Sequence, residues 1–452
     1  MTGPLRESDA DHTDDSEAPG LAAPPRRLGA LTATLLVVAS MIGTGVFTTT
    51  GFLVADIRSP SAVLLAWLVG GIVALCGALA YGELAAALPR NGGEYQLLSR
   101  IYHPLVGFVA GWISFVVGFS APIAASALAF GHYLAALAPG VDPVVSAAVL
   151  AVALSALHAL HVTLGARVQN VLTLAKVALI VLFIVGGLAK VDVGLVFAGA
   201  DAAFGEAAFS PAFAVGLIFV SFAYAGWNGA VYLGGEVRRP GRNLPLALVA
   251  GTGLVVVLYC LLNLVFLSSA PAQQLAGVLE IGHVAAAEIF GARAGSWLTA
   301  MIALALVSSV GALIMAGPRV YESVGRDYPA LAVLSRRSRM GGPVVALALQ
   351  TVAILVMIAT ASFGTLLTYI GFTLSVSSGL TVVGVMVLRR REPDLERPYR
   401  TLLYPLTPLL FTLLSLWMIV HALGQRPAAG LAGLATMAAG VVLFLLVRRR
   451  ER

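Results

Sequence analysis

The sequence predicts an all-α polytopic membrane protein with about twelve transmembrane helices. Two observations support this fold class. Hydrophobic residues make up 59% of the 452 residues and charged residues only 11%, against roughly 25% charged residues in a soluble domain. Apolar runs of about 20 residues or more, which is enough to cross a bilayer, recur along the chain. These runs cover residues 28–55, 60–88, 104–136, 142–162, 167–189, 209–235, 243–270, 295–325, 343–361, 363–388, 402–423 and 428–447.

The two ends of the chain are predicted to lie on the same, cytoplasmic side. Residues 1–27 are polar and lack the basic start and short apolar stretch of a cleaved signal peptide, so we expect a disordered tail. When the twelve spans alternate between sides, nearly all of the 28 Lys and Arg residues fall on the side of the termini. Because basic residues concentrate in cytoplasmic loops, we expect a multi-pass protein of the cytoplasmic (inner) membrane with residues 1–27 and 448–452 inside. The net charge of +6 then reflects orientation, with no nucleic-acid partner. Five Lys and Arg residues do not fall on the side of the termini: Lys176 lies within a span, and Arg58, Lys190, Arg293 and Arg426 lie on the other side.

A Gly-x-Gly break interrupts the first span at Gly43 and Gly45. It lies roughly 20 Å of helix rise from Arg27, near the middle of a ~30 Å hydrocarbon layer. Irregular backbone at that depth is tolerated only where it is buried in protein or lines a watery cavity. The glycines would let a ligand touch the main chain, and freed amides at the start of the outer half-helix favour an anion such as a carboxylate. The alternative is a glycine-rich face for helix packing.

The sixth span carries a matching interruption within residues 221–229, Ser-Phe-Ala-Tyr-Ala-Gly-Trp-Asn-Gly. Interrupted spans at corresponding positions of two halves are the best sequence pointer to the binding site of a transporter with inverted repeats. The even number of spans, with both termini on one side, also fits such a protein. We therefore predict a first repeat over residues 28–190, a second over 209–388, and two further helices within 402–447.

Lys176 is the most informative side chain, because it lies about 13 Å beyond Arg167 and so at membrane depth. A charge there costs at least ~2.5–3.5 kcal/mol and normally faces the protein interior in a functional role. Snorkelling to the cytoplasm is the alternative. A buried ammonium could neutralise carbonyls freed by the first break or act in proton coupling. Ser308 and Ser309 of the eighth span could share its hydrogen bonds.

No Asp or Glu is predicted at membrane depth in any span, since Glu83, Glu236 and Glu322 fall at cytoplasmic ends. A cationic substrate would need a countercharge or an aromatic cage. A neutral zwitterion fits better, because main-chain amides can bind its carboxylate and main-chain carbonyls its ammonium. Trp227 leaves a cation–π route open, although packing is the commoner role for a tryptophan in a membrane helix.

Metal and catalytic chemistry are disfavoured. The histidines His132, His158 and His161 are isolated from any carboxylate or cysteine partner, which argues against a metal site or a nucleophilic triad. Cys76 and Cys260 lie inside apolar runs and are expected to be buried and unpaired. We therefore expect no metal, no cofactor and no enzymatic activity.

Several motifs together resemble the amino acid–polyamine–organocation (APC) superfamily and, within it, the L-type amino acid transporter-like permeases. The likeness runs through most of the chain after about residue 28. Residues 41–47, Met-Ile-Gly-Thr-Gly-Val-Phe, are similar to the family's Gly-Ser-Gly-Ile-Phe signature, with Thr44 for the usual serine. The other matching motifs are Tyr-Gly-Glu-Leu at 81–84, Pro-Arg-Asn-Gly-Gly-Glu-Tyr at 89–95, Gly-Phe and Gly-Trp within 107–112, Phe-Ala-Tyr-Ala-Gly-Trp-Asn at 222–228, the segment 235–245, Gly-Pro-Arg-Val-Tyr at 317–321 and Arg-Pro-Tyr-Arg at 397–400.

The resemblance implies a LeuT-like fold, a 5+5 inverted repeat of ten helices plus two C-terminal helices. It implies that the amides of Thr44 and Gly45 bind the substrate carboxylate and that carbonyls of the two breaks bind its ammonium. Lys176 matches the lysine that replaces a sodium ion in sodium-independent members. Phe222 matches the family's aromatic residue that gates the substrate. The carbonyls implied to bind the substrate ammonium are those of Met41, Phe222 and Ala225. The expected substrate-binding set is Met41, Gly43, Thr44, Gly45, Phe222, Ala223, Ala225, Trp227 and Asn228.

Two departures from the family pattern bear on substrate choice. Residues 321–329 replace a commoner motif and leave Glu322 unexplained, and the chain lacks the tryptophan that arginine/agmatine-type antiporters carry near Ala312. We therefore expect a sodium-independent permease for neutral L-amino acids that works by alternating access, by exchange or with proton coupling, and with no evident partner subunit. The alternatives are a polyamine or cationic amino acid antiporter and a sensor that binds amino acids without moving them.

Overall fold

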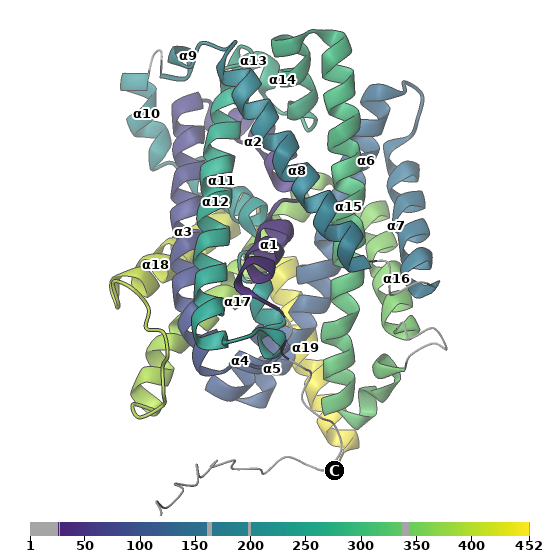
Figure 1. The fold of residues 1–452 in the computed structure, drawn as a ribbon, viewed down its shortest axis with the longest axis vertical. Coiled ribbons are helices and arrows are strands. Elements are labelled where there is room, and N and C mark those ends of the chain that lie inside the picture. Colours follow the sequence, from purple (N-terminus) through teal and green to yellow (C-terminus); the bar gives the residue numbers. More distant parts are fainter. Residues whose placement is uncertain (1–25, 27, 161–164, 198–199, 337–342, 452) are drawn as a thin grey trace, which may run out of the picture.

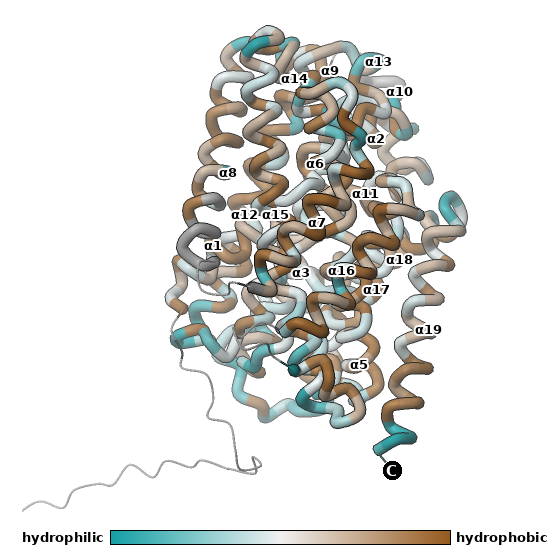
Figure 2. Tube along the Cα trace, turned by 90° about the vertical axis from the view of Figure 1, so that its right-hand side faces the viewer, coloured by the Kyte–Doolittle hydropathy of each residue, from teal (hydrophilic) through white to brown (hydrophobic). Residues whose placement is uncertain are grey.

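The computed structural model is an elongated bundle of helices that describes residues 26, 28–160, 165–197, 200–336 and 343–451 (Figure 1). Within these residues there is no β-strand, and two isolated bridges are the only extended pairing. Hydrophobic residues run along the middle of the outer helices, while hydrophilic residues gather toward the two ends (Figure 2). Such a belt of exposed apolar side chains is the surface expected against lipid.

Among the described residues, seven helices are long and apolar enough to cross a membrane, and one bent pair makes an eighth span. The bent pair has an angle of 40° at its break. Four shorter apolar helices complete the twelve predicted spans, so the all-α polytopic fold is confirmed. The seven are α3 (Pro60–Ala87), α5–η1–α6 (Pro104–Leu137), α12 (Pro240–Leu267), α15 (Ala292–Asp327), α17 (Phe363–Arg391), α18 (Leu406–Gln425) and α19 (Pro427–Arg450). The bent pair is α1 (Ala30–Met41) with α2 (Gly45–Ile57), and the shorter four are α7 (Pro143–Leu160), α8 (Gly165–Leu188), α11 (Pro211–Tyr224) and α16 (Val344–Thr360).

The remaining short elements lie at the two ends of the bundle. One end of the bundle holds α4 and the C-terminus (Figure 1). The last turns of α17 and α19 carry three arginines each, 389–391 and 448–450, and we call this end the Arg-rich end. At the opposite end lie four short helices. The bounds are α4 (Glu94–Ile101), η2 (Gly229–Tyr232), η3 (Gly234–Glu236) and η4 (Pro329–Ser335), then α9 (Gly194–Phe197), α10 (Ala200–Ala208), α13 (Ala272–Leu275) and α14 (Ile281–Phe290) at the opposite end.

Serine–proline pairs begin two of the spans. The hydroxyl of Ser59 accepts a hydrogen bond from the N–H of Ala62 at 3.3 Å, and Ser210 accepts one from Phe213 at 3.1 Å. In each case proline is the first helical residue, where its missing N–H costs nothing and its fixed φ suits the helix. These local signals explain why the starts of α3 and α11 could be predicted closely.

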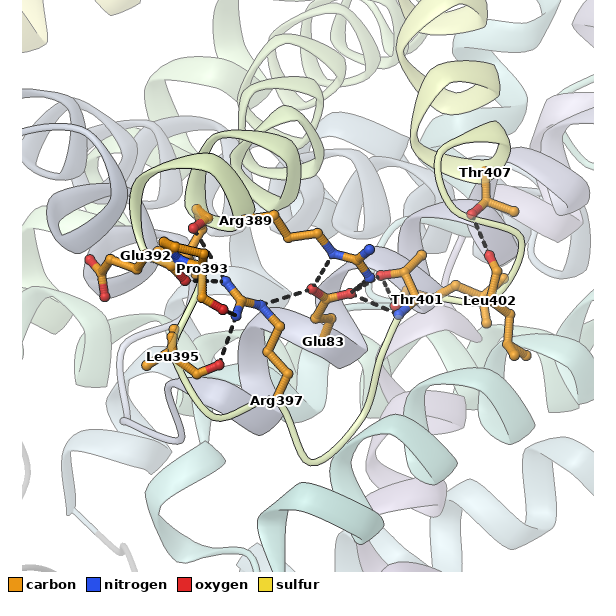
Figure 3. A network of polar contacts seen from close by, with 11 residues as sticks. Glu83, Arg389, Glu392, Pro393, Leu395, Arg397, Thr401, Leu402 and Thr407 are labelled. Carbon is orange, nitrogen blue, oxygen red and sulfur yellow. Dashed lines mark hydrogen bonds and ion pairs between the residues drawn. The ribbon is translucent and has the colours of Figure 1, made fainter.

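A buried ion-pair network joins α3, α17 and the chain before α18 at the Arg-rich end (Figure 3). The carboxylate of Glu83, 2% exposed, accepts hydrogen bonds from Nε and Nη2 of Arg389 at 2.8 and 2.7 Å. It also accepts the N–H and the hydroxyl of Thr401, both at 2.7 Å, and lies 3.4 Å from Nε of Arg397. Glu83 thus compensates two arginines that are 23% and 6% exposed.

Glu83→Ala is expected to lower the free energy of unfolding by about 3 kcal/mol, because it leaves partly buried charges unpaired. The measurement is the thermal unfolding midpoint in detergent. Glu392→Ala is the matched control, since Glu392 pairs with Arg100 at 2.6 Å on the surface, where the two side chains are 30% and 51% exposed. That exposed pair is worth at most about 1 kcal/mol. Equal shifts for the two variants would contradict the assignment.

Candidate functional site

The breaks of the first and sixth spans lie against each other. A Cβ atom on Gly45 would lie 2.3 Å from the Cα of Ala223, so only glycine permits this contact between α2 and α11. Gly226 has φ of +102°, and a Cβ there would lie 2.4 Å from the carbonyl oxygen of Ser40. The sixth span therefore loses its regular helix after Tyr224 and continues through η2 and η3. The two interruptions meet main chain to main chain.

A cavity of about 1160 Å³ opens from this contact. Its walls include α1, α2, α11, η1, α15, α17 and α18. At one end it reaches Arg26, Arg90 and Asp327, which belong to the Arg-rich end. Within the described part of the chain, none of its lining residues comes from the short helices at the opposite end. The cavity therefore opens toward the Arg-rich end.

Every residue of the expected substrate-binding set lines this cavity. Phe222, the expected aromatic gate, is 7% exposed. Trp227 combines both readings from the sequence, since it lines the cavity and also packs edge-on against Tyr81 with ring centroids 4.7 Å apart. The full set brought together is Met41, Gly43, Thr44, Gly45, Phe222, Ala223, Ala225, Trp227 and Asn228.

The main chain around the break presents both donors and acceptors. The N–H groups of Gly45 and Val46 at the start of α2 have no helical acceptor, whereas the Phe47 N–H donates to the Thr44 carbonyl at 3.0 Å. The Thr44 side chain does not cap them, and its hydroxyl bonds to that of Ser126. The carbonyl of Met41, in contrast, already accepts hydrogen bonds from Tyr259 Oη at 2.7 Å and from the Gly43 N–H at 2.8 Å. Of the three carbonyls implied for the ammonium, Met41 thus accepts two hydrogen bonds, and Phe222 accepts one, from the Ala225 N–H at 3.0 Å. The amides at the start of α2 are the freer groups and are open to an anion.

Lys176 lies inside the bundle. Its side chain is 3% exposed, and its Nζ donates a hydrogen bond to Ser309 Oγ at 2.8 Å, near the middle of α15. Because α8 packs against α1, α12 and α15, the side chain does not snorkel to an end of the bundle. Ser309 lines the cavity, so the ammonium reaches the cavity wall through this hydroxyl. The Ser308 hydroxyl has no hydrogen-bond partner among the residues described, so the expected sharing by both serines is not seen.

A family model described as "Amino acid permease" matches residues 28–446. The chain belongs to the amino acid permease family. This permease is 30% identical to the mouse b(0,+)-type amino acid transporter 1 over 420 residues, which cover 89% of this chain and 84% of the relative. It is 29% identical to the human large neutral amino acids transporter small subunit 2 over 452 residues, covering 97% and 83% of the two chains. The expected membership of the APC superfamily is confirmed, and the permease is a transport protein and not an enzyme.

Glu94 of the permease is a cavity residue that the sequence reasoning missed. It is the first residue of α4, is 4% exposed and lines the cavity. Burial raises the pKa of its carboxyl group, against the lowering effect of hydrogen bonds from Ser377, Tyr81 and Asn228. A carboxylate therefore does face the site, from α4 and not from a span. The available signal was the preceding glycine pair, because Gly93 has φ of +59° in the turn that directs Glu94 inward.

The expectation that the histidines of the permease are isolated is wrong for His132. Nδ1 of His132 lies 3.1 Å from Oε1 of Glu280, just before α14, and this hydrogen bond lowers the pKa of the Glu280 carboxyl group. His161 lies outside the described residues. Among those that are described, no three His, Cys, Asp or Glu side chains gather as metal ligands would.

Proposed function

We propose that this permease moves neutral L-amino acids across the cytoplasmic membrane by alternating access and without sodium. The observation that carries the proposal is the contact between two interrupted spans at the head of a cavity. There the unpaired N–H groups at the start of α2 favour the substrate carboxylate. The carbonyls released by the breaks favour its ammonium, so bare main chain can hold a zwitterion.

The wall that faces a substrate side chain favours a neutral one. Ala312, Leu313, Met315 and Ala316 of α15 line the cavity and carry no charge. The name of the human relative refers to large neutral amino acids, which agrees with such a wall. The acidic residues that line the cavity are Glu94, Glu236, Glu322 and Asp327. Glu94 already accepts hydrogen bonds from three other side chains, and Glu322 pairs with Arg326 at 2.7 Å.

Sodium independence rests on Lys176. Its ammonium bonds to Ser309 at the cavity wall, on a helix that packs against both α1, which leads into the first break, and α15. The fixed positive charge of Lys176 replaces a bound cation, because it stabilises the partial negative charges of the carbonyl oxygens freed by the break. Transport then needs no sodium, and either exchange or proton coupling can drive it.

The described conformation corresponds to the inward-facing state of this cycle. By the concentration of arginines, the Arg-rich end and both termini are cytoplasmic, so the cavity opens inward. On the other side α2 is fastened at three points. Tyr133 Oη donates to the Phe47 carbonyl at 2.7 Å, the Gly277 N–H donates to the Gly51 carbonyl at 2.7 Å, and Arg426 pairs with Asp56 at 2.9 Å. Alternating access would release these contacts as the first and sixth spans rock against a scaffold formed by the rest of the repeats 28–190 and 209–388, with 402–447 as the added pair of helices.

The human relative is named a small subunit. For this chain we propose transport without a covalently attached partner subunit. Its two cysteines, Cys76 and Cys260, lie inside α3 and α12, where a disulfide to another chain has no access.

The test is uptake by proteoliposomes that contain the purified chain alone. We expect accumulation of labelled leucine or alanine at equal rates in sodium and in potassium buffer. Strict dependence on sodium would overturn the role given to Lys176. Strong competition by arginine, agmatine or putrescine would favour a cationic antiporter, and binding by calorimetry without flux would favour a sensor. Stimulation by internal amino acid or by a pH gradient distinguishes exchange from proton coupling.

A further inference from the structure

Glu94 fixes the orientation of the Asn228 side chain. An asparagine amide has a donor end, Nδ2, and an acceptor end, Oδ1. Nδ2 of Asn228 donates to Glu94 Oε1 at 3.1 Å, and the same oxygen accepts the hydroxyl of Tyr81 at 2.5 Å. Because Oε1 acts as the acceptor for both groups, the amide must turn its nitrogen toward Glu94. Its oxygen is then directed away from Glu94, on a residue that lines the cavity.

The Glu94 carboxylate itself has little freedom to move. Its other oxygen, Oε2, accepts the hydroxyl of Ser377 at 2.6 Å, so donors from α3, α17 and the broken sixth span all converge on it. Its oxygens are engaged by these neutral donors, and the residue is 4% exposed. Glu94 is therefore better suited to hold a neighbour than to bind a cationic ligand directly.

The segment that carries Asn228 is held by the same turn between α3 and α4. The N–H of Gly92 donates to the Tyr232 carbonyl at 3.2 Å, and the N–H of Gly235 donates to Asn91 Oδ1 at 2.9 Å. Asn228 follows Gly226, at φ of +102°, and belongs to no helix, so these contacts fix its position. The turn that begins α4 therefore determines where the Asn228 amide lies.

An additional acceptor is useful at this site. A substrate ammonium offers three N–H donors, and the Met41 carbonyl expected to accept one of them is already bonded to Tyr259 and Gly43. The Oδ1 atom of Asn228 is an acceptor at the cavity wall, on the same broken segment as the Ala225 carbonyl.

We propose that Glu94 is a positioning residue for substrate binding, which holds Nδ2 of Asn228 so that Oδ1 accepts a hydrogen bond from the substrate ammonium. This inference rests on the proposed function. It assigns Asn228 a contact with the amino group common to all amino acids. Loss of the contact should then weaken every substrate to a similar degree, whatever its side chain.

The experiment compares variants for the KM and Vmax of leucine uptake. In Glu94→Gln the glutamine oxygen accepts from Ser377 and its nitrogen faces Asn228, so the Asn228 amide turns its oxygen toward residue 94 and its nitrogen toward the cavity. We expect KM to rise at least about 10-fold, as for a lost hydrogen bond to a charged group, with Vmax within about twofold. In the double variant Glu94→Gln/Asn228→Asp, the glutamine donates to one aspartate oxygen and the other oxygen faces the cavity. We expect its KM to return to within about threefold of the wild-type value. Glu392→Gln makes the same acid-to-amide change in the surface pair with Arg100, is the control and should leave KM within about twofold.

An unchanged KM for Glu94→Gln would overturn the proposal, as would a double variant no better than the single one. If Glu94→Gln fails to fold, as judged by size exclusion in detergent, the double variant decides alone. A KM near the wild-type value supports the proposal, and a KM raised 10-fold or more contradicts it. Leucine binding by calorimetry in detergent is measured for every variant. If the wild type binds leucine without transporting it, the proposed transport fails while the dissociation constants still test Glu94. Absence of binding by the wild type would overturn both.

Discussion

Lys176→Met is expected to lower amino acid uptake at least 100-fold and, at the same time, to raise the thermal unfolding midpoint. The Lys176 ammonium is almost fully buried and its hydrogen-bond partner Ser309 is a neutral hydroxyl, which compensates little of the cost of removing a charge from water. Replacing a buried charge with an apolar side chain of similar volume is often stabilising by about 1–4 kcal/mol. Uptake should fail because the proposed stabilisation of the first break depends on this positive charge.

The opposite signs of these two effects separate a functional lysine from a structural one. A lysine kept for stability would give a variant that unfolds earlier and keeps its uptake in proportion to the folded fraction. Ser308→Ala is the matched control, because Ser308 neighbours Ser309 in the chain but its hydroxyl has no partner among the described residues. We expect uptake within about twofold of wild type for that control. A stable Lys176→Met protein with uptake above one tenth of wild type would refute the role.

The fold followed from the sequence because a membrane span depends on length and apolarity alone. The predicted run 60–88 became α3, Pro60–Ala87, and 104–136 became Pro104–Leu137. Within the run 209–235 an interruption was predicted, and the chain leaves the helix at Tyr224 because Gly226 takes a positive φ against Ser40. Apolarity marks what lies in the membrane, and local backbone geometry decides whether it is helical.

The site was predictable where main chain forms it and not where distant side chains meet. Glycine pairs point to Gly45 and Gly226 without knowledge of any partner. Glu94, in contrast, is charged and follows a polar loop, so hydropathy assigns it to the surface, while its burial depends on Tyr81 and on Ser377, far along the chain. Separations of this kind leave no pattern in a single sequence.

The two serines of α15 show a further limit. Consecutive residues of a helix point about 100° apart, so Ser308 and Ser309 cannot both face the same neighbour. The sequence places both near Lys176, but the rotation of α15 about its axis is set by packing against α6, α7 and α14. Only Ser309 therefore receives the hydrogen bond.

Gly45→Ala is expected to reduce uptake at least 100-fold, because the new methyl group would lie 2.3 Å from the Cα of Ala223 and 2.6 Å from its Cβ. These atoms of Ala223 cannot move aside by a change of rotamer, so α2 and α11 must separate by about an ångström or more. A displacement of that size at a binding site lowers the rate on the order of 100-fold. The measurement is leucine uptake per folded protein, with folding judged by size exclusion in detergent.

Gly43→Ala provides the matched control within the same break. A Cβ on Gly43 would meet its nearest neighbour, the Met41 carbonyl oxygen, at 3.9 Å, an ordinary contact. We expect this variant to keep most of its uptake, although both glycines belong to the same Gly-x-Gly motif. Because the two changes are chemically identical and two residues apart, only the contact with Ala223 separates them. Equal loss in both would mean that flexibility of the break, and not close approach of α2 to α11, makes these glycines necessary.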